Sequence, residues 1–286
     1  MRITLIDVPY DSGRHAERMG RGAAVLAASL PPALATAGHD VESRAARLPP
    51  GFVAEVAAVV GLQRIVRAEV AAAREGGRLP VVLSGNCGYA ALGATAGLGP
   101  GTAVLWLDAH ADFNTPETSP SGFFDGTSLA ALCGRAWPGV ARSFAGFTPV
   151  PESSVVLLGA RDLDDEERRM LLASEVSWVP PAALRAGPAA LAAALDRIAG
   201  GAERLYLHLD LDVIDPGDLR ANVYSCPGGL TVDDVVTAIA AAGERLPIAA
   251  VGITAYDPRV DVAGRGPAVA SRLVHAVVAA STPLPA

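Results

Sequence analysis

Short apolar runs alternate along the chain with longer segments in which apolar residues recur at helical spacing. The short runs predict β-strands at residues 3–8, 80–83, 103–107, 155–158, 176–179, 205–209 and 248–253, and residues 41–45 are a candidate edge strand. The longer segments predict helices at residues 52–75, 89–96, 166–173, 189–198, 232–242 and 268–280. Because strands and helices alternate, we expect parallel βαβ units, and thus a single three-layer α/β/α domain over residues 1–286 with a mostly parallel central sheet.

Two segments depart from this regular alternation. Residues 21–37 have helical periodicity, but Pro31 and Pro32 interrupt it, so two short helices are expected there. Residues 114–125 are polar and predict a long loop soon after the strand at 103–107. Ligands of α/β sheets bind at the carboxyl ends of the strands, which is the end from which this loop leaves.

Acidic residues and a histidine follow the apolar strand at 103–107. Asp108, His110 and Asp112 form an Asp-x-His-x-Asp pattern. A continuous apolar run is typical of a strand buried on both faces, so these side chains would stand at the edge where ligands bind. Two carboxylates and an imidazole suit Mn²⁺ or a related divalent cation. The alternative interpretation is an ordinary polar loop after a strand.

A second strand ends in the same way. The apolar run at 205–209 is followed by Asp210 and Asp212. Buried carboxylates are costly unless they are paired or bind a metal, and no Lys or Arg stands nearby in the sequence. We therefore expect the two acidic strand ends to face each other and to share a pair of cations.

Composition narrows the function further. The chain has 51% hydrophobic residues, enough for a sizeable core, and its formal net charge of −7 without a basic stretch argues against a nucleic-acid partner. Its cysteines, Cys87, Cys133 and Cys226, have no close spacing, which favours free thiols in a reducing cytoplasm. No signal peptide and no apolar run of membrane-spanning length is expected.

The two acidic motifs resemble those of the ureohydrolases, the family of arginase, agmatinase and formimidoylglutamase. The motifs are Asp-Ala-His-Ala-Asp-Phe-Asn-Thr-Pro at 108–116 and Asp-Leu-Asp-Val-Ile-Asp-Pro at 210–216. The resemblance covers nearly the whole chain, from Val8-Pro9 to Tyr256-Asp257-Pro258. It implies an arginase-like fold, a C–N hydrolase that acts on linear amidines, a small amino-acid substrate, two Mn²⁺ ions that activate water, and a trimer or hexamer.

The resemblance also implies individual roles. Asp108 and Asp210 would bridge the two metals, His110 and Asp212 would complete one of them, and Asp112 the other. The family takes the last ligand from a histidine where this chain has Cys87. A soft thiolate suits Mn²⁺ poorly, so this metal is expected to bind less tightly or to be a different ion. Alternatively, Cys87 is only a small buried residue.

Two further positions depart from the family pattern. The histidine assigned as an acid or base is replaced by Asp125, which relays a proton if its pKa is raised by burial. The glutamate that pairs with the guanidinium is replaced by Ala255. His208, two residues before Asp210, is expected either to support the metals or to be a hydrogen-bonded core histidine. The catalytic candidates are therefore Asp112, Asp125 and His208.

The residues that hold the amino-acid end of the substrate match the arginase pattern. These are Asn114, Ser119 and Ser121 for the α-carboxylate, and Asp164 for the α-amino group. A kept amino-acid pocket beside an altered guanidinium pocket favours N-omega-hydroxy-L-arginine, which is less basic than arginine. The resemblance extends to the family members of D-cycloserine biosynthesis, which release hydroxyurea and L-ornithine. The alternatives are an ordinary arginase and a non-catalytic homologue that binds guanidino amino acids.

Overall fold

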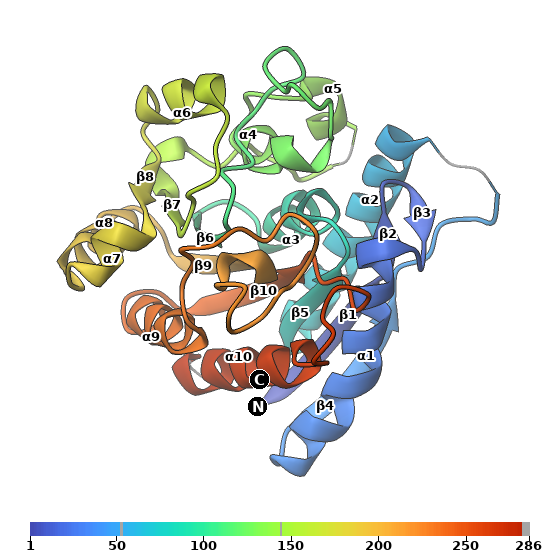
Figure 1. The fold of residues 1–286 in the computed structure, drawn as a ribbon. Coiled ribbons are helices and arrows are strands. Elements are labelled where there is room, and N and C mark those ends of the chain that lie inside the picture. The colour runs from blue at the N-terminus through green and yellow to red at the C-terminus, as the bar shows by residue number, and fades with distance from the viewer. Residues whose placement is uncertain (52–53, 144, 282–286) are drawn as a thin grey trace.

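The computed structural model of the protein describes residues 1–51, 54–143 and 145–281. Its central sheet has eight parallel strands in the order β4-β1-β5-β10-β9-β6-β7-β8 (Figure 1). The strands are β1 Arg2–Val8, β4 Asp40–Ala45, β5 Leu79–Ser84, β6 Thr102–Leu107, β7 Val155–Leu158, β8 Ser177–Val179, β9 Arg204–Asp210 and β10 Ile248–Thr254. Each lies within one residue of the range that the apolar runs predict.

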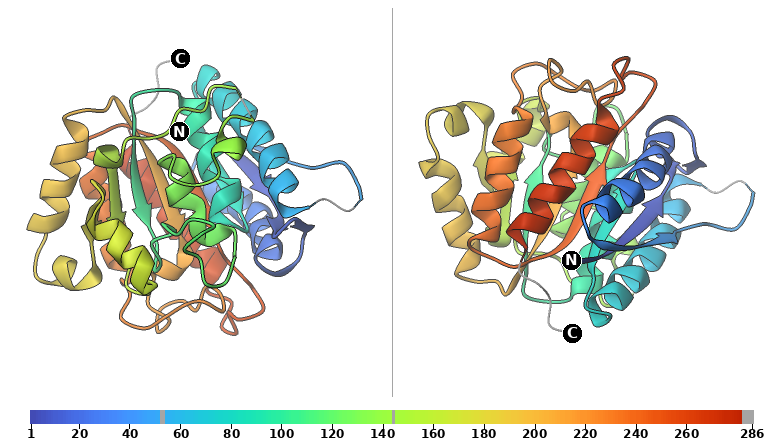
Figure 2. Two further views of the ribbon diagram at one scale, coloured as in Figure 1. Left: turned by 90° about the horizontal axis from the view of Figure 1, so that it is seen from above. Right: turned by 90° about the horizontal axis from the view of Figure 1, so that it is seen from below.

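Helices cover both faces of the sheet and confirm the three-layer α/β/α prediction. The α-helices are α1 Arg18–Thr36, α2 Glu55–Glu75, α3 Ala91–Leu98, α4 Ser128–Leu132, α5 Pro138–Ala141, α6 Asp165–Leu172, α7 Pro181–Arg185, α8 Ala189–Ala199, α9 Val232–Gly243 and α10 Gly266–Ala280. Figure 2 shows α1, α9 and α10 on one face, and α2 and α3 on the other. Together they form one α/β domain of the kind the sequence predicts.

The central strands such as β6 are apolar because both of their faces are buried. In β6, Ala103, Leu105 and Leu107 belong to the core under α1, α8, α9 and α10, whereas Val104 and Trp106 belong to the core under α2 and α3. Successive side chains of a strand point to opposite faces, so a strand between two helical layers has no polar side. Polar residues are therefore left for the strand ends, where the acidic motifs stand.

The prediction of two short helices at 21–37 is wrong, because α1 runs through Pro31 and Pro32 without a break. Leu26, Leu30 and Leu34 are buried in the core on both sides of the prolines and hold the turns in place. The two prolines cannot donate to the carbonyls of residues 27 and 28, which are half-buried and exposed, so water can reach these carbonyls. Tertiary packing thus overrides the local signal.

Several short elements were not predicted. They are the antiparallel hairpin of β2 Tyr10–Asp11 and β3 Arg14–His15, the helices α4, α5 and α7, and the 3₁₀ turns η1 Cys87–Tyr89, η2 Asp125–Thr127, η3 Glu152–Ser154 and η4 Leu211–Val213. The first two residues of the helix predicted at 52–75 lie outside the described residues, and α2 itself is as predicted from Glu55 onward. The loop predicted at 114–125 is irregular up to η2.

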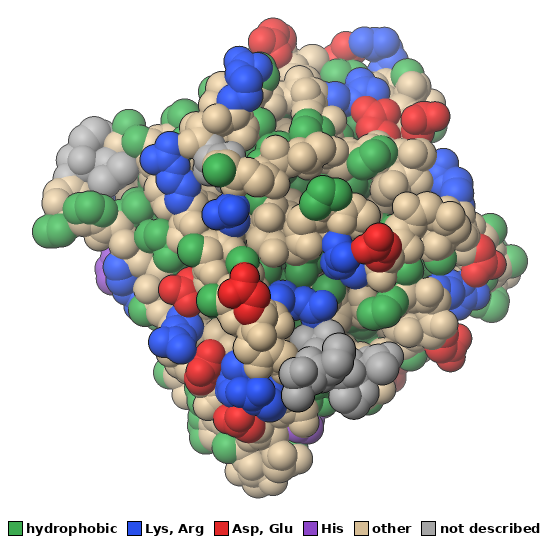
Figure 3. All heavy atoms as spheres, turned by 180° about the vertical axis from the view of Figure 1, so that it is seen from behind, with side chains coloured by type: hydrophobic (Ala, Val, Ile, Leu, Met, Phe, Trp, Pro, Cys, Tyr) green, Lys and Arg blue, Asp and Glu red, His purple; other side chains and the backbone are tan. Residues whose placement is uncertain are grey.

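Two observations bear on partners. In the part of the chain that the structure describes, no helix is both long enough and apolar enough to cross a lipid bilayer. On the face drawn in Figure 3, acidic and basic side chains are interspersed, and the coloured atoms form no continuous basic patch. Such a patch would be the electrostatic footprint of a nucleic-acid partner.

Strand register brings the two acidic motifs to one level. Leu107 of β6 pairs with Leu209 of β9, and Thr254 of β10 pairs with Asp210. Asp108 follows Leu107 and Asp210 follows Leu209, so the two aspartates leave neighbouring strands side by side. On the other side of β10, Thr254 pairs with Ser84, the last residue of β5, which leads into Cys87. The center of the sheet thus ends in one cluster of polar side chains.

Candidate metal centre and active site

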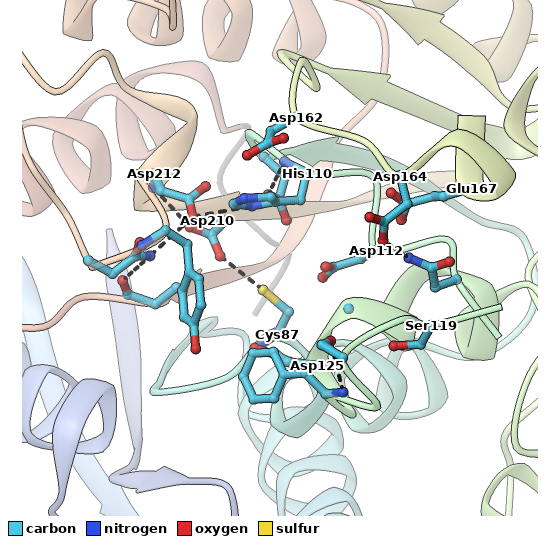
Figure 4. A pocket seen from close by; sticks show the side chains of 18 of the residues that line it. Cys87, His110, Asp112, Ser119, Asp125, Asp162, Asp164, Glu167, Asp210 and Asp212 are labelled. Atoms are coloured by element: carbon cyan, nitrogen blue, oxygen red, sulfur yellow. Dashed lines mark hydrogen bonds and ion pairs between the residues drawn. The ribbon is translucent and has the colours of Figure 1, made fainter. Parts of the chain in front are cut away.

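The carboxyl ends of the central strands open into a cavity of about 320 Å³. Most of the residues proposed from the sequence line it: Cys87, Asp108, His110, Asp112, Asn114, Ser119, Ser121, Asp125, Asp164, Asp210 and Asp212. Figure 4 shows Asp210 and Asp212 on one side, Ser119, Asp164 and Glu167 on the other, and Cys87 and Asp112 between them. The cavity therefore has two ends: an acidic strand end, which includes Asp210 and Asp212, and a loop end, which includes Ser119, Asp164 and Glu167 (Figure 4).

Three overlapping groups of ligand-type side chains lie in this cavity. They are Asp108, His110 and Asp212; Cys87, Asp108 and Asp210; and Cys87, Asp112 and Asp125, with the ligand atoms of each group within 4.8 Å of one another. His110 Nδ1 is 3.3 Å from Asp108 Oδ1 and 3.4 Å from Asp212 Oδ2. Shared members such as Asp108 are what a pair of bridged cations requires.

The charges of the cavity fit bound cations. Its described lining residues include seven aspartates and one glutamate, with His110 as the single basic side chain. Burial, followed by the charge of Asp108, raises the pKa of Asp112 well above its usual range, and burial and Asp212 do the same for Asp210. Buried Asp112 Oδ2 has no hydrogen-bond partner. Since uncompensated buried carboxylates are costly, an orphaned oxygen in such a cluster points to a metal ligand.

Hydrogen bonds fix the carboxylates in these positions. Trp106 Nε1 donates to Asp108 Oδ2 at 3.0 Å, and the backbone amide of Asp212 donates to Asp210 Oδ1 at 2.8 Å. Asn222 Nδ2 donates to Asp212 Oδ2 at 3.1 Å. Asp112 holds its place with a φ of 50°, a left-handed conformation that is uncommon for a non-glycine residue. Each carboxylate oxygen has two lone pairs, so these bonds position the carboxylates and still leave them the capacity to bind cations.

The imidazole of His110 is set between two acids. Burial opposes its protonation, but the charges of Asp212 and Asp108 raise its pKa to about 10. Without a cation this histidine is therefore protonated and serves as the counter-ion of the cluster. A divalent cation bound by the same carboxylates would displace that proton, because a metal-ligating imidazole is neutral.

Comparison with known proteins identifies the fold. The family model described as the arginase family matches residues 2–280. The chain belongs to the arginase family. It is thus a hydrolase of amidino groups, and enzymes of this family depend on two metal ions. This confirms the ureohydrolase resemblance and the predicted class of enzyme.

Similarity to individual proteins supports the same family assignment. The chain is 32% identical over 233 residues to the N(omega)-hydroxy-L-arginine amidinohydrolase of Streptomyces lavendulae, which covers 79% of this chain and 80% of that protein. It is 32% identical over 206 residues to the arginase of Bacillus caldovelox, covering 69% and 68%. The crystal structure of the Bacillus cereus arginase superposes with a TM-score of 0.87 at 26% identity, covering 97% and 98%.

Cys87 stands where the family resemblance places a histidine. Its Sγ lies 3.2 Å from Asp210 Oδ2 and 3.2 Å from Thr254 Oγ1. Burial and the surrounding carboxylates raise the pKa of the thiol well above its usual range. Cys87 is thus a protonated thiol, and it would have to lose its proton to bind a cation.

Asp125 stands at the family's second histidine position and is held rigidly. Its Oδ2 accepts from Asn86 Nδ2 at 2.8 Å and from the amide of Cys87 at 3.2 Å, and its Oδ1 accepts from the amide of Gly88 at 2.8 Å. Ser128 Oγ lies 3.1 Å from Oδ1. Burial raises the pKa of Asp125 to about 7, against the opposing effect of these donors.

The loop end of the cavity carries the residues predicted for the amino-acid group. Asn114 Nδ2 donates to Asp164 Oδ2 at 3.0 Å, and Thr118 Oγ1 donates to Asn114 Oδ1 at 2.9 Å. Ser119 and Ser121 lie in the same loop and also face the cavity. The structure thus brings the four predicted residues together, in reach of one small ligand.

His208 is the one proposed site residue that does not line the cavity. It is completely buried, stacks on Trp106 at 3.7 Å between ring centroids, and contacts Tyr206 OH through Nδ1 at 3.0 Å. Burial lowers its pKa to about 3, so it is neutral. Of the two interpretations given for it, the hydrogen-bonded core histidine describes this position, and no direct contact with substrate is open to it.

Sequence reasoning missed several residues of the cavity. Asp162 and Glu167 flank Asp164, and burial raises the pKa of Glu167 to about 7. Glu167 follows Asp164 by three positions at the start of α6, a spacing that places both on one side of a helix and could have revealed it. Met19, Phe123, Asn222 and Tyr224 come from loops and from the start of α1, and they belong to no motif in the sequence.

Proposed function

We propose that the protein hydrolyses N-omega-hydroxy-L-arginine to L-ornithine and hydroxyurea, with two Mn²⁺ ions, in an antibiotic pathway such as that of D-cycloserine. The observation that supports this is Ala255. It lies at the end of β10, is 3% exposed and lines the cavity, so the place of the family's guanidinium-pairing glutamate holds a methyl group. A protonated guanidinium beside two cations would lack its anionic partner there, and its binding free energy would be less favourable by about 2–5 kcal/mol.

An N-hydroxyguanidine avoids this problem. It is less basic than a guanidine, so a larger fraction is neutral near pH 7 and is less repelled by the cations. The amidinohydrolase of Streptomyces lavendulae, whose name gives hydroxyarginine as its substrate, shares 32% of aligned residues with this chain. Its similarity supports the same substrate here.

The chain's own residues bind and orient the substrate. Asn114, Ser119 and Ser121 donate hydrogen bonds to the α-carboxylate, and Asp164 accepts from the α-ammonium group. Charge-assisted bonds of this kind contribute about 1.5–3 kcal/mol each. They direct the distal nitrogen atoms of the substrate toward the acidic strand ends, where the scissile carbon comes to rest.

Asp108, His110, Asp210 and Asp212 would hold the cations together with Asp112 and Cys87. When bound, these cations supply Lewis-acid chemistry and lower the pKa of the attacking water. Asp112 keeps its orphaned oxygen free for this purpose. Mn²⁺ is favoured because five of the six ligands are the hard carboxylate and imidazole types that it prefers.

Asp125 is suited to hold the proton that leaves with the amine. Ser128 Oγ lies 2.6 Å from the backbone oxygen of Asp125 and 3.1 Å from its Oδ1. The Ser128 hydroxyl can rotate, so it donates to the ionised carboxylate and can accept from the carboxyl once Asp125 is protonated. With a pKa of about 7, Asp125 both gains and loses a proton near neutral pH.

The test is kcat/KM for N-omega-hydroxy-L-arginine and L-arginine at saturating Mn²⁺, with hydroxyurea and urea measured separately. We expect hydroxyarginine to be preferred by at least about a hundredfold, which corresponds to roughly 2.7 kcal/mol of transition-state stabilisation. A wild-type protein that prefers L-arginine would overturn the proposal.

Ordinary arginase activity is the second candidate. It is favoured by the arginase of Bacillus caldovelox, which reaches the same 32% identity. The same pair of assays decides between the two, since urea would then be the main product.

We also infer a cytoplasmic, oligomeric protein. Cys87, Cys133 and Cys226 are free thiols, which fits a reducing compartment. The trimer or hexamer implied by family resemblance is checked by light scattering, where a monomer would refute it.

A further inference from the structure

Tyr224 is a cavity residue with no role in the binding or catalysis proposed above. It lies in the loop between η4 and α9, lines the cavity and is 40% exposed. Its ring stands edge-on to His110 at 6.5 Å between centroids, with an angle of 89°. Tyr224 is thus placed beside the Asp108, His110 and Asp212 group, where the distal end of the substrate would lie.

Contacts from three directions hold this side chain. Its ring stacks on Phe123, from the loop that carries Ser119 and Ser121, at 5.7 Å between centroids. Its backbone amide donates to Asn222 Oδ1 at 2.9 Å. Its hydroxyl accepts from Arg18 Nη2 at 3.2 Å, at the start of α1. A rotamer fixed at ring, backbone and hydroxyl is already ordered before substrate binds, which lowers the entropic cost of a contact.

Arg18 is itself fixed in place. Its Nε lies 3.4 Å from the buried carboxylate of Asp11, which also accepts from the amide of Met19 at 3.2 Å. Asp11 thus ties the start of α1 to the hairpin of β2 and β3. The guanidinium that reaches Tyr224 is therefore part of a built arrangement.

Three neighbours of Tyr224, Asn222, Met19 and Ala255, have no hydrogen-bond donor left for a ligand. Asn222 uses both amide hydrogens, toward Asp212 Oδ2 at 3.1 Å and the carbonyl oxygen of Ala255 at 2.9 Å. Met19 and Ala255 offer no polar side-chain atom. Tyr224 accepts from Arg18, so its own hydroxyl proton is available to a ligand.

We propose that Tyr224 is a specificity residue, which donates a hydrogen bond to the oxygen of the substrate's N-hydroxyguanidino group. The proposal rests on the proposed function and names the side chain that selects its substrate. Asn222 links the backbone of Tyr224 to the backbone of Ala255, and both residues line the same cavity, so the phenol and the position of the missing glutamate belong to one pocket. Where the family has an acidic acceptor, the glutamate, this pocket has a neutral donor, the phenol. A neutral donor suits an N-hydroxyguanidine, which has one more oxygen and less positive charge than a guanidinium.

The test compares Tyr224→Phe with the wild type. This variant keeps the ring and its packing and removes only the hydroxyl. We expect kcat/KM for N-omega-hydroxy-L-arginine to fall about five- to tenfold, as one hydrogen bond warrants, and kcat/KM for L-arginine to stay within about twofold. Arg18→Met should shift the same ratio in the same direction by a smaller factor, because it releases the hydroxyl without removing it.

Two controls isolate the contact. Val223→Ala changes an exposed neighbour in the same loop and should leave both substrates unaffected. Inhibition by L-ornithine, which has the amino-acid group but no guanidino group, should have the same Ki in Tyr224→Phe as in the wild type. An unchanged Ki shows that the variant is folded and that its loop end is intact.

The outcomes separate the two proposals. The wild-type ratio of hydroxyarginine to arginine tests the function, and the change of that ratio in Tyr224→Phe tests the residue. Equal losses for both substrates, or none, would overturn the role of Tyr224 even where the function holds. If the wild type favours L-arginine, hydroxyarginine is used as a competitive inhibitor, and an unchanged Ki in Tyr224→Phe overturns the assignment just as well.

Discussion

The two ends of the cavity are built on different principles. At the strand end, Asp108 and Asp210 leave neighbouring strands whose register is fixed by a ladder of hydrogen bonds, and both are almost fully buried. At the loop end, Ser119 and Ser121 sit in an irregular segment that is half-buried to exposed. The first end depends on the whole sheet, whereas the second depends on a few local bonds such as that between Asn114 and Asp164.

The two ends also differ in how closely they follow the family. The loop end keeps each residue that the resemblance assigns to the amino-acid group. The strand end keeps the acidic ligands but carries Cys87, Asp125 and Ala255 at three positions where the resemblance places other residues. A substrate with an unchanged amino-acid end and a modified guanidino end accounts for both facts. Variants confined to one end therefore test the assignment.

Loss of the two acids proposed to bridge the metals should have the largest effect. In the double variant Asp108→Asn, Asp210→Asn, two shared anionic ligands are lost, so we expect metal retention after dialysis to collapse and kcat to fall by at least about a thousandfold. Metal content by mass spectrometry and hydrolysis rates are the two readouts. The matched control is Asp196→Asn with Asp233→Asn, the same chemical change at two exposed positions. Full metal content and activity in the Asp108, Asp210 variant would mean that the site is misplaced.

Restoring the family pattern at the strand end should reverse the substrate preference. Ala255→Glu with Asp125→His returns an anionic partner and an imidazole, and we expect the hydroxyarginine to arginine ratio of kcat/KM to drop by about a hundredfold. Residue 255 has a φ of 62°, which Ala already tolerates, so Glu adds little backbone strain. Ala255→Gln with Asp125→His serves as the control of equal size without the charge. If the ratio moves equally in both, charge is not what selects the substrate.

The strand end is also the part that the sequence predicts best. Strands buried on both faces are continuous apolar runs, and the acids that interrupt them at Asp108 and Asp210 can only stand at the edge of the sheet. Parallel pairing then brings them together whatever the intervening helices do. The grouping of the acidic side chains and the fold follow from the same pattern, which is why the sequence predicts both.

The residues that the sequence did not reveal depend on contacts distant along the chain. Tyr224 is held at the cavity by contacts with Arg18 and Phe123, and neither residue lies near it in sequence. His208 has the strand spacing of a site residue, but it is buried in the core, where its ring stacks on Trp106. The unbroken helix α1 is a third case, since the core around Leu30 and Leu34 outweighs Pro31 and Pro32. Local patterns carry no information about such packing.

A variant of the loop end should weaken substrate binding without weakening metal binding. Asp164→Asn removes the anionic acceptor for the α-ammonium group, and we expect kcat/KM for the amino-acid substrate to fall about 10- to 100-fold, as charge-assisted hydrogen bonds warrant. Metal content should stay at the wild-type level, in contrast to the Asp108, Asp210 variant. Asp165→Asn, the next acid along the chain, is the matched control. Agmatine, which lacks the carboxylate, should be a poor substrate, and equal turnover of agmatine would contradict the assignment of this end.

The smallest expected effect concerns the metal position that Cys87 is proposed to complete. Its thiol has a raised pKa, so a cation must first displace a proton and then accept a soft ligand that Mn²⁺ does not favour. Cys87→His supplies a harder, neutral ligand from a position that lines the cavity, and we expect Mn²⁺ affinity at one of the two sites to rise about three- to tenfold. Cys87→Ser, close in size to the native residue, should not raise it. Stepwise titration with Mn²⁺ resolves the two sites, and only the weaker one should respond. If Cys87→His leaves both affinities unchanged, residue 87 is a packing residue, and the difference between the two ends rests on Asp125 and Ala255 alone.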